Sequence, residues 1–466
     1  MLFSSIPFLY YFLPVVLIVY YLVPKPAKNM VLLLASLVFY GWGEPSYVFL
    51  MMASIGLGYV FGLLIEKLRG TIWSKVCMVA SVVISFGFLG YFKYANFFIR
   101  NFNGATGLSI PLLNVVLPIG ISFYTFQLVS YIIDVYWGKV AAQKNLVILA
   151  TYITMFPQLI AGPIVRYSDV ERQLAERSIT FEKIAYGIRR FCIGLGKKIL
   201  IANILGEYCA AFKATDEKSV IFYWTYAIAV SLQIYFDFSG YSDMAIGLGS
   251  MLGFHFIENF NYPFVSKSAT EFWRRWHMSL GSWFRDYVYI PLGGSRCSGR
   301  RLMFNIFVVW MLTGFWHGAE WNFIIWGLYF GCLLMIEKSF LLKWLEKYKG
   351  FGHVYILLLA MISFIIFDAS NMGAAVQHIG AMFGFSGAPV LTEITVYYLK
   401  SYAIVFALAV VGATPIPKLL VNKIMEYKIG NAIIKNIEPI GMAALLLVVT
   451  AYLVDGSFNP FLYFRF

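Results

Sequence analysis

Residues 302–336 read LMFNIFVVWMLTGFWHGAEWNFIIWGLYFGCLLMI, two apolar runs on either side of a single histidine, His317. The runs 302–316 and 322–336 approach the roughly 20 residues that a helix needs to cross a membrane. An ionisable side chain at membrane depth is costly, and it usually faces the protein interior or a water-filled cavity. This stretch therefore predicts two membrane helices with a histidine of functional interest between them.

The rest of the chain has the same apolar character. Of its 466 residues, 60% are hydrophobic and 13% are charged, and the mean hydropathy is +0.74. Soluble domains are typically about 45–50% apolar and about 25% charged, so this chain has too few polar residues to cover a water-soluble particle. We expect an all-α polytopic membrane protein whose single membrane domain occupies residues 1–466.

Apolar runs recur along the whole chain, and several are shorter than a full span. The sequence FPQLIAGPIVRY at 156–167 also places two prolines and a glycine inside an apolar run. Short or broken helices are tolerated at membrane depth only where protein or a water-filled cavity shields the backbone. A broken or re-entrant helix that lines a deep cavity is therefore predicted, with an ordinary proline kink as the alternative. The remaining runs are 6–23, 29–42, 47–65, 73–92, 115–137, 146–165, 219–238, 354–367, 402–414 and 439–454.

The net charge of +13 is concentrated in two stretches. Residues 166–198 contain eight basic and four acidic residues, and residues 267–301 contain seven basic and two acidic residues. Cytoplasmic loops of membrane proteins are rich in lysine and arginine, so both stretches are expected to face the cytoplasm. Membrane topology thus explains the charge, and we expect no nucleic-acid partner.

His317 is the first candidate for chemistry. It lies in LTGFWHGA at 312–319, between two apolar runs. A neutral imidazole near pH 7 is the commonest general base. The alternative is a histidine at a helix end that only makes a structural hydrogen bond.

His277 follows Arg274, Arg275 and Trp276 in a segment rich in cationic and aromatic residues. Such a segment suits the cytoplasmic interface, where its arginines could bind the phosphates of an anionic donor. Anchoring by positive charge and a tryptophan belt is an equally good explanation for each arginine. However, seven of the twelve tryptophans, Trp316 among them, fall between positions 273 and 326, and this clustering favours a lined pocket.

Asp237 and Asp243 interrupt the apolar stretch QIYFDFSGYSD at 233–243. Buried carboxylates need partners, so the two are candidates for the pocket, although a structural pair that holds helices in register is the simpler explanation. The five cysteines lack a CxxC pair, which gives no support for a metal site. The motifs of zincins, α/β-hydrolases and P-loop enzymes are also missing from the sequence.

A series of motifs, nearly from end to end, resembles the membrane-bound O-acyltransferases, and within them the bacterial alginate O-acetylase-like branch. One departure is Phe-Asp-Ala-Ser at 367–370, where relatives often continue Phe-Arg; it bears on the acceptor or a partner. The motifs are MLFSS (1–5), PIGISFYTFQ (118–127), FPQLIAGPIVRY (156–167), FDFSGYSDMA (236–245), FWRRWHMSL (272–280), TGFWHG (313–318) and NPFLYFRF (459–466).

The resemblance implies a ring of about eleven transmembrane helices, with additional short or re-entrant helices. A funnel from each membrane face is expected to meet at a thin central region. His317 matches the near-invariant histidine of the family, and His277 matches its second histidine. His317 would act as the general base, while His277 would orient or polarise the donor thioester or assist proton transfer.

By the same resemblance, this is an O-acetyltransferase of the bacterial cytoplasmic membrane, surrounded by lipid and without a bound cofactor or metal. Its donor, acetyl-CoA or an acyl-carrier thioester, would approach from the cytoplasm. The acetyl group would reach an extracytoplasmic polysaccharide or cell-wall glycan through a separate extracytoplasmic transferase or esterase-like protein. The alternatives are D-alanyl transfer from a carrier protein to teichoic acid, and a non-enzymatic transporter or scaffold for polysaccharide export.

Overall fold

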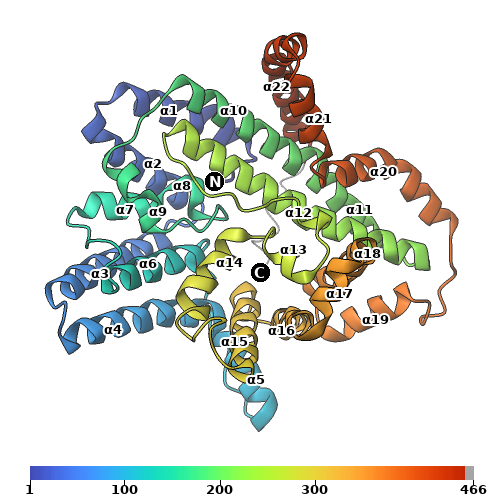
Figure 1. Cartoon of the computed structure of the whole chain (residues 1–466), viewed down its shortest axis with the longest axis horizontal. Coiled ribbons are helices and arrows are strands. Elements are labelled where there is room, and N and C mark those ends of the chain that lie inside the picture. Colours follow the sequence, from blue (N-terminus) through green and yellow to red (C-terminus); the bar gives the residue numbers. More distant parts are fainter. Residues whose placement is uncertain (457–466) are drawn as a thin grey trace. The chain divides into compact units, whose positions relative to one another are not determined.

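The computed structural model describes residues 1–456, and all regular secondary structure in this part of the chain is helical (Figure 1). Within it, seven helices are long and apolar enough to cross a membrane, and residues 7–22 form a shorter apolar helix. This confirms the all-α polytopic architecture. The eleven-helix ring and its two funnels remain predictions, as does the single membrane domain, and the motif at 459–466 lies outside the described residues. The seven helices are Tyr47–Lys67, Ile72–Thr106, Val220–Met251, Trp321–Lys347, Gly350–Asp368, Glu393–Gly412 and Lys428–Asp455.

The chain divides into two compact units. The first comprises Met1–Phe191 and Met244–Ile257, and the second comprises Cys192–Asp243 and Glu258–Phe466. Two helices, α10 (Phe181–Gly196) and α12 (Val220–Met251), contribute residues to both units. All the candidate site residues named above belong to the second unit.

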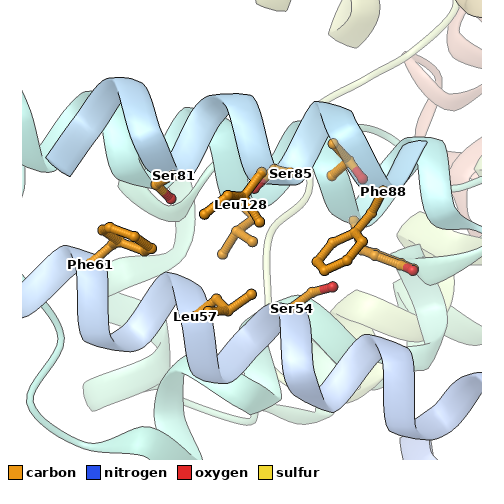
Figure 2. A pocket seen from close by; sticks show the side chains of 10 residues that line it. Ser54, Leu57, Phe61, Ser81, Ser85, Phe88 and Leu128 are labelled. Atoms are coloured by element: carbon orange, nitrogen blue, oxygen red, sulfur yellow. The ribbon is translucent and has the colours of Figure 1, made fainter. Parts of the chain in front are cut away.

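In the first unit, α3, α4 and α6 lie side by side (Figure 1). A hollow of about 10 Å³ separates them, and Figure 2 shows Ser54 and Leu57 of α3 facing Ser81 and Ser85 of α4 across it. This volume is sufficient for one water molecule, so the hollow is no substrate site. The unit contains η1 (Pro7–Phe12), α1 (Leu13–Leu22), η2 (Lys25–Ala27), α2 (Lys28–Gly41), α3 (Tyr47–Lys67), α4 (Ile72–Leu89), η3 (Gly90–Tyr94), α5 (Ala95–Thr106), α6 (Ile121–Tyr136), α7 (Leu146–Thr154), α8 (Phe156–Leu159) and α9 (Tyr167–Ala175).

The apolar run that contains FPQLIAGPIVRY is broken, as expected. Helix α7 ends at Thr154, the single turn of α8 follows, and α9 begins at Tyr167. Pro157 lies in the first turn of α8, where proline is tolerated. A Cβ at Gly162 would lie 2.6 Å from the Cα of Gln158, so no larger residue fits there without a shift of the backbone. The break is confirmed, and its proposed place in a re-entrant segment remains a prediction.

In the second unit, α15 packs extensively against α16, and residues 318–320 join the two helices (Figure 1). Small residues permit this close approach. A Cβ at Gly314 would overlap the carbonyl oxygen of Phe323, and a Cβ at Gly327 would overlap that of Trp310. The unit contains η4 (Lys197–Asn203), α11 (Ile204–Ala214), η5 (Pro263–Val265), α13 (Ala269–Trp273), α14 (Met278–Phe284), η6 (Arg285–Tyr289), α15 (Gly299–His317), α16 (Trp321–Ile336), η7 (Glu337–Leu341), α17 (Leu342–Lys347), α18 (Lys349–Asp368), α19 (Met372–Met382), α20 (Glu393–Gly412), α21 (Ile416–Met425) and α22 (Lys428–Asp455).

Candidate functional site

His317 is the last residue of α15, and its side chain is buried among aromatic rings. Its imidazole centroid lies 4.9 Å from the nearest ring of Trp326 on α16 and 5.4 Å from that of Phe367 on α18. The preceding residue, Trp316, contacts the same imidazole at 5.0 Å. The tight α15–α16 crossing at Gly314, one turn earlier, therefore brings Trp326 onto His317.

His277 precedes α14 and is only 2% exposed. Its backbone has φ 44° and ψ 53°, in the left-handed region that residues with a Cβ rarely adopt. Such strain persists only where the surrounding structure enforces it, and it is frequent at functional sites. The ring packs edge-on against Phe238 of α12 at a centroid distance of 4.7 Å.

The indole of Trp316 links the two histidines. Its ring lies 6.0 Å from that of His277 and 5.0 Å from that of His317. The two histidines are 40 positions apart in the sequence: His317 ends α15, whereas His277 lies between α13 and α14. They therefore belong to one buried aromatic cluster in the second unit.

Asn259 determines which ring nitrogen of His277 carries the hydrogen. The Oδ1 atom of Asn259 accepts hydrogen bonds from the backbone N–H of Ser279 at 3.2 Å and from the Ser279 hydroxyl at 2.9 Å. Because a backbone N–H can only donate, this atom must be the amide oxygen. The Nδ1 atom of His277, 3.1 Å away, must then carry the hydrogen and donate it.

The other ring nitrogen of His277 is consequently the one with the lone pair. Burial lowers the pKa of His277 to about 3, which keeps the imidazole neutral near pH 7. Its Nε2 atom is buried and has no hydrogen-bond partner among residues 1–456. A hydrogen-bond acceptor is thus held ready in this aromatic cluster.

The tryptophans of this region divide into two groups. Trp326, which contacts His317, also packs against Trp273 at 5.5 Å, and Trp273 packs against Trp310 at 4.7 Å. Within the described residues, the buried indole N–H groups of Trp273 and Trp326 have no acceptor. Trp276 lies in the same hydrophobic core and packs against Phe272, which in turn contacts Trp273. Trp321, in contrast, is exposed. The clustering in the sequence therefore includes a real aromatic cluster around His317, but not all seven residues join it.

The two candidate arginines do not turn toward the histidines. Arg274 is exposed, and its side chain forms no hydrogen bond or ion pair within residues 1–456. Arg275 donates through Nε to Glu271 at 3.0 Å and through Nη1 to the carbonyl oxygen of Asn261 at 3.1 Å. The guanidinium of Arg275 thus holds the segment 261–275 together, whereas Arg274 remains accessible to a ligand from solvent.

Both candidate aspartates form ion pairs with the neighbouring η4 segment. Asp237 lies 2.5 Å from the Nζ atom of Lys198, and both side chains are almost fully buried. Asp243 lies 2.7 Å from the Nζ atom of Lys197. These contacts fit the structural alternative, since they tie α12 to η4. The same stretch of α12 contributes Phe238 to the histidine cluster.

Four residues of this cluster have no place among the sequence candidates: Asn259, Phe238, Trp326 and Phe367. Phe238 directly follows Asp237, Phe367 begins the Phe-Asp-Ala-Ser segment, and Trp326 is one of the seven clustered tryptophans. Asn259 lies in the polar segment 258–261, and no motif marks it. Its role depends on a turn that brings residue 259 beside residues 277–279.

Comparisons with known proteins show which family the chain resembles. Residues 141–371 match the model of the membrane-bound O-acyltransferase family. The chain is 40% identical to a probable alginate O-acetylase of Azotobacter vinelandii over the full length of both chains. It is 32% identical to a peptidoglycan O-acetyltransferase of Helicobacter pylori over 83% of this chain and 80% of the relative. A teichoic acid D-alanyltransferase of Bacillus subtilis is 35% identical over 51% of this chain and 63% of the relative.

Proposed function

Because the chain belongs to the membrane-bound O-acyltransferase family, we propose that it moves an acetyl group from a cytoplasmic thioester donor across the membrane, for the O-acetylation of an extracytoplasmic polysaccharide or cell-wall glycan. It is a multi-pass bacterial membrane protein and an acyltransferase. The observation that carries the proposal is the contact of Trp316 with both His277 and His317, which gathers the two histidines in one buried cluster.

In the proposed reaction, His317 acts as the general base. It removes the proton of an acceptor hydroxyl, the hydroxyl oxygen attacks the thioester carbonyl carbon, and the C–S bond breaks. The products are an oxygen ester and a thiol, which takes up the proton. A positioned general base contributes about 10²–10⁴-fold to such a rate. Alignment of the two substrates in a site that excludes water supplies much of the remainder.

His277 is assigned to the proton path. Three roles are open to it from its place across the Trp316 ring from His317: orienting the thioester, polarising its carbonyl, or assisting proton transfer. A neutral imidazole with hydrogen on Nδ1 offers only an acceptor at Nε2, and polarising a carbonyl requires a donor. The bond to Asn259 therefore favours assistance to proton transfer. The buried indole N–H of Trp326, next to His317, is the better candidate for a donor to the carbonyl oxygen.

The donor is proposed to be acetyl-CoA or an acyl-carrier thioester. Both carry phosphate groups, and the basic segment that precedes α15, with exposed Arg274, suits such a ligand. A separate extracytoplasmic transferase or esterase-like protein is proposed to pass the acetyl group to the glycan. This last step rests on the resemblance alone.

The test is the loss of glycan acetylation in a His317→Ala variant. Cells that produce the variant at normal membrane levels should contain no ester-linked acetate above background. The matched control is His255→Ala, because His255 is exposed and its side chain has no recorded contact. Acetylation that persists in His317→Ala would contradict the assignment of the base.

D-alanyl transfer is the second candidate, favoured by the similarity to the Bacillus subtilis D-alanyltransferase. Release of ester-linked groups from purified cell-wall material by mild alkali distinguishes the two reactions. Acetate that depends on His317 supports the proposal, and D-alanine that depends on His317 supports the alternative.

A further inference from the structure

The first unit contains a second, larger hollow of about 300 Å³. It lies where η2 and the start of α2 meet the start of α7 and the segment that follows α9. This volume is at the lower end of the range typical of small-molecule sites. We call it the basic pocket, and the polar residues that line it are Lys25, Lys28, Asn29, Asn145, Glu176 and Arg177.

The positive charge of the basic pocket exceeds its negative charge. Lys25, Lys28 and Arg177 contribute three cations, whereas Glu176 is the one carboxylate that lines it. Within the described chain, none of these four residues forms an ion pair. Cations gathered without a carboxylate partner are typical of a site that receives an anion from outside.

Neutral groups hold two of these cations in place. The Nζ atom of Lys28 donates to the carbonyl oxygen of Tyr20 at 2.7 Å and lies 4.3 Å from the centre of the Tyr20 ring. The Nε atom of Arg177 donates to the hydroxyl of Tyr20 at 2.7 Å, and its Nη1 atom donates to Asn29 at 2.8 Å. Burial and the neighbouring Arg177 charge lower the pKa of Lys28. The pocket is therefore preorganised, and an anion would relieve the repulsion between its cations.

The first turn of α2 adds to this field. The helix begins at Lys28 without a side-chain cap, so the positive end of its dipole lies at Lys28, beside the other cations of the pocket. Helix starts of this kind bind phosphate groups. Together with the lysines and the arginine, the start of α2 favours an anionic phosphate ester over a neutral ligand.

One face of α1, the helix that precedes the pocket residues Lys25 and Lys28 in the chain, is apolar and exposed. Val15, Ile18, Val19 and Leu22 have the i, i+3, i+4, i+7 spacing of one face of α1, and all four are exposed. Leu22, at the end of this stripe, is 80% exposed and stands three positions before Lys25. An apolar stripe that ends at a cluster of cations complements a diacyl phospholipid. The acyl chains would lie beside the helix, and the phosphate would lie at its end.

We propose that the basic pocket binds the phosphate of an anionic phospholipid, whose acyl chains lie along the exposed stripe of α1. The site is additional to the acyl-transfer chemistry of the second unit. A soluble phosphate ester offers the same phosphate chemistry without acyl chains, so the experiment must distinguish the two sources.

The test uses the full-length protein purified in mild detergent after exposure to vesicles of one part phosphatidylglycerol and three parts phosphatidylcholine. Native mass spectrometry then measures the retained phosphatidylglycerol. Lys25→Glu should lower this retention by at least about fivefold, since one basic residue near an anionic lipid surface contributes about that factor. Lys25 is exposed and has no recorded contact, so this variant is expected to fold normally. Lys28→Gln should have the same direction of effect.

Lys67→Glu is the matched control, because Lys67 is also exposed, lacks a recorded contact and does not line the pocket. Equal retention in Lys25→Glu, Lys67→Glu and the unaltered chain would overturn the proposal. Displacement of the lipid by millimolar glycerol 3-phosphate would reassign the pocket to soluble phosphate esters and overturn the lipid assignment. Loss of phosphatidylglycerol only in the pocket variants, with no displacement by glycerol 3-phosphate, would support it.

Discussion

The Nδ1 atom of His277 lies 3.1 Å from the Oδ1 atom of Asn259, and this contact determines which of the two ring nitrogens can accept a proton. Asn259 is held in turn by Ser279, whose N–H and hydroxyl donate to the same oxygen. The hydrogen on Nδ1 leaves the lone pair on Nε2, inside the cluster that contains Trp316 and His317. Asn259 is therefore a positioning residue for the proposed chemistry.

Replacement of Asn259 by alanine should slow acetyl transfer by about 10–100-fold, by analogy with the loss seen when the orienting partner of a metal-ligating histidine is removed. The neutral ring would then be free to place its hydrogen on either nitrogen. Asn259→Asp retains an acceptor and should keep more activity, while its negative charge raises the pKa of His277. The acid limb of the pH–rate profile should therefore move to higher pH in Asn259→Asp.

Ser279→Ala is the companion to this pair of variants, because it removes a hydroxyl that lies 2.9 Å from Asn259 Oδ1 and 3.4 Å from His277 Nδ1 while Asn259 stays in place. Rates are to be compared at equal membrane levels. An Asn259→Ala variant with the rate of the unaltered chain would show that the tautomer of His277 has no influence on turnover.

The low pKa of His277 predicts a loss of stability in acid. Its pKa is about 3 in the folded protein against 6.5 for an ordinary histidine. Above pH 6.5 both states are neutral and the group has no effect; between pH 6.5 and about 3 only the unfolded state binds the proton. The free energy of unfolding therefore falls as the pH drops, by about 2 kcal/mol at pH 5 from this group.

Thermal denaturation in detergent at pH 8, 6 and 5 measures this effect. His277→Gln lacks the titrating group, so its melting temperature should fall less steeply with acid than that of the unaltered chain. His378, whose pKa burial lowers to about 4, acts in the same direction but is present in both proteins. Parallel curves for the two proteins would exclude His277 as a source of the acid sensitivity.

Many of the helices were predictable from the sequence because its long apolar runs fall within helices of the structure. The run 219–238 falls short of α12, which continues to Met251. Serine, glycine and aspartate lower the hydropathy of this last part, yet it remains helical because its small and polar side chains are buried, with Asp243 paired to Lys197. That pairing is tertiary and leaves no trace in local composition.

The site was predictable only where a motif marked it. His277 and His317 stood out because histidine is rare in this chain and both interrupt apolar or aromatic segments. Arg275 is a candidate for the donor or for interfacial anchoring on its sequence alone, and Glu271, four positions earlier, offers it an i,i+4 partner on a helix. Asn259 carried no such signal, because its contact with His277 bridges 18 positions and exists only in the folded turn.

The close crossing of α15 and α16 should be intolerant of a methyl group at Gly314. The added Cβ would meet the carbonyl oxygen of Phe323, which is backbone and cannot rotate away. We expect Gly314→Ala to cost about 1–3 kcal/mol of stability, as overpacking does in other proteins. It should also lower the rate of acetyl transfer, since it displaces the helix that presents His317 to Trp326.

Gly299→Ala, at the open start of α15, has no atom within 4 Å of its added methyl and should behave like the unaltered chain. A thermal shift assay on both variants, with acetyl transfer measured at equal protein, decides between these outcomes.

The buried pair of Asp237 and Lys198 distinguishes a structural role from a role toward the donor. Removal of one partner, in Asp237→Asn or Lys198→Met, alters a buried charge pair and typically costs about 3–5 kcal/mol, so membrane levels should fall.

Removal of both charges in Asp237→Asn/Lys198→Met eliminates that penalty. If the pair only joins α12 to η4, the double variant should recover both membrane level and acetyl transfer. If Asp237 acts on the donor, the double variant should reach normal levels and remain inactive. Lys213→Met, which breaks the more exposed pair with Asp368, is the control and should change the level little. We expect recovery of activity in the double variant, because the carboxylate of Asp237 is directed to Lys198 while its neighbour Phe238 contacts His277.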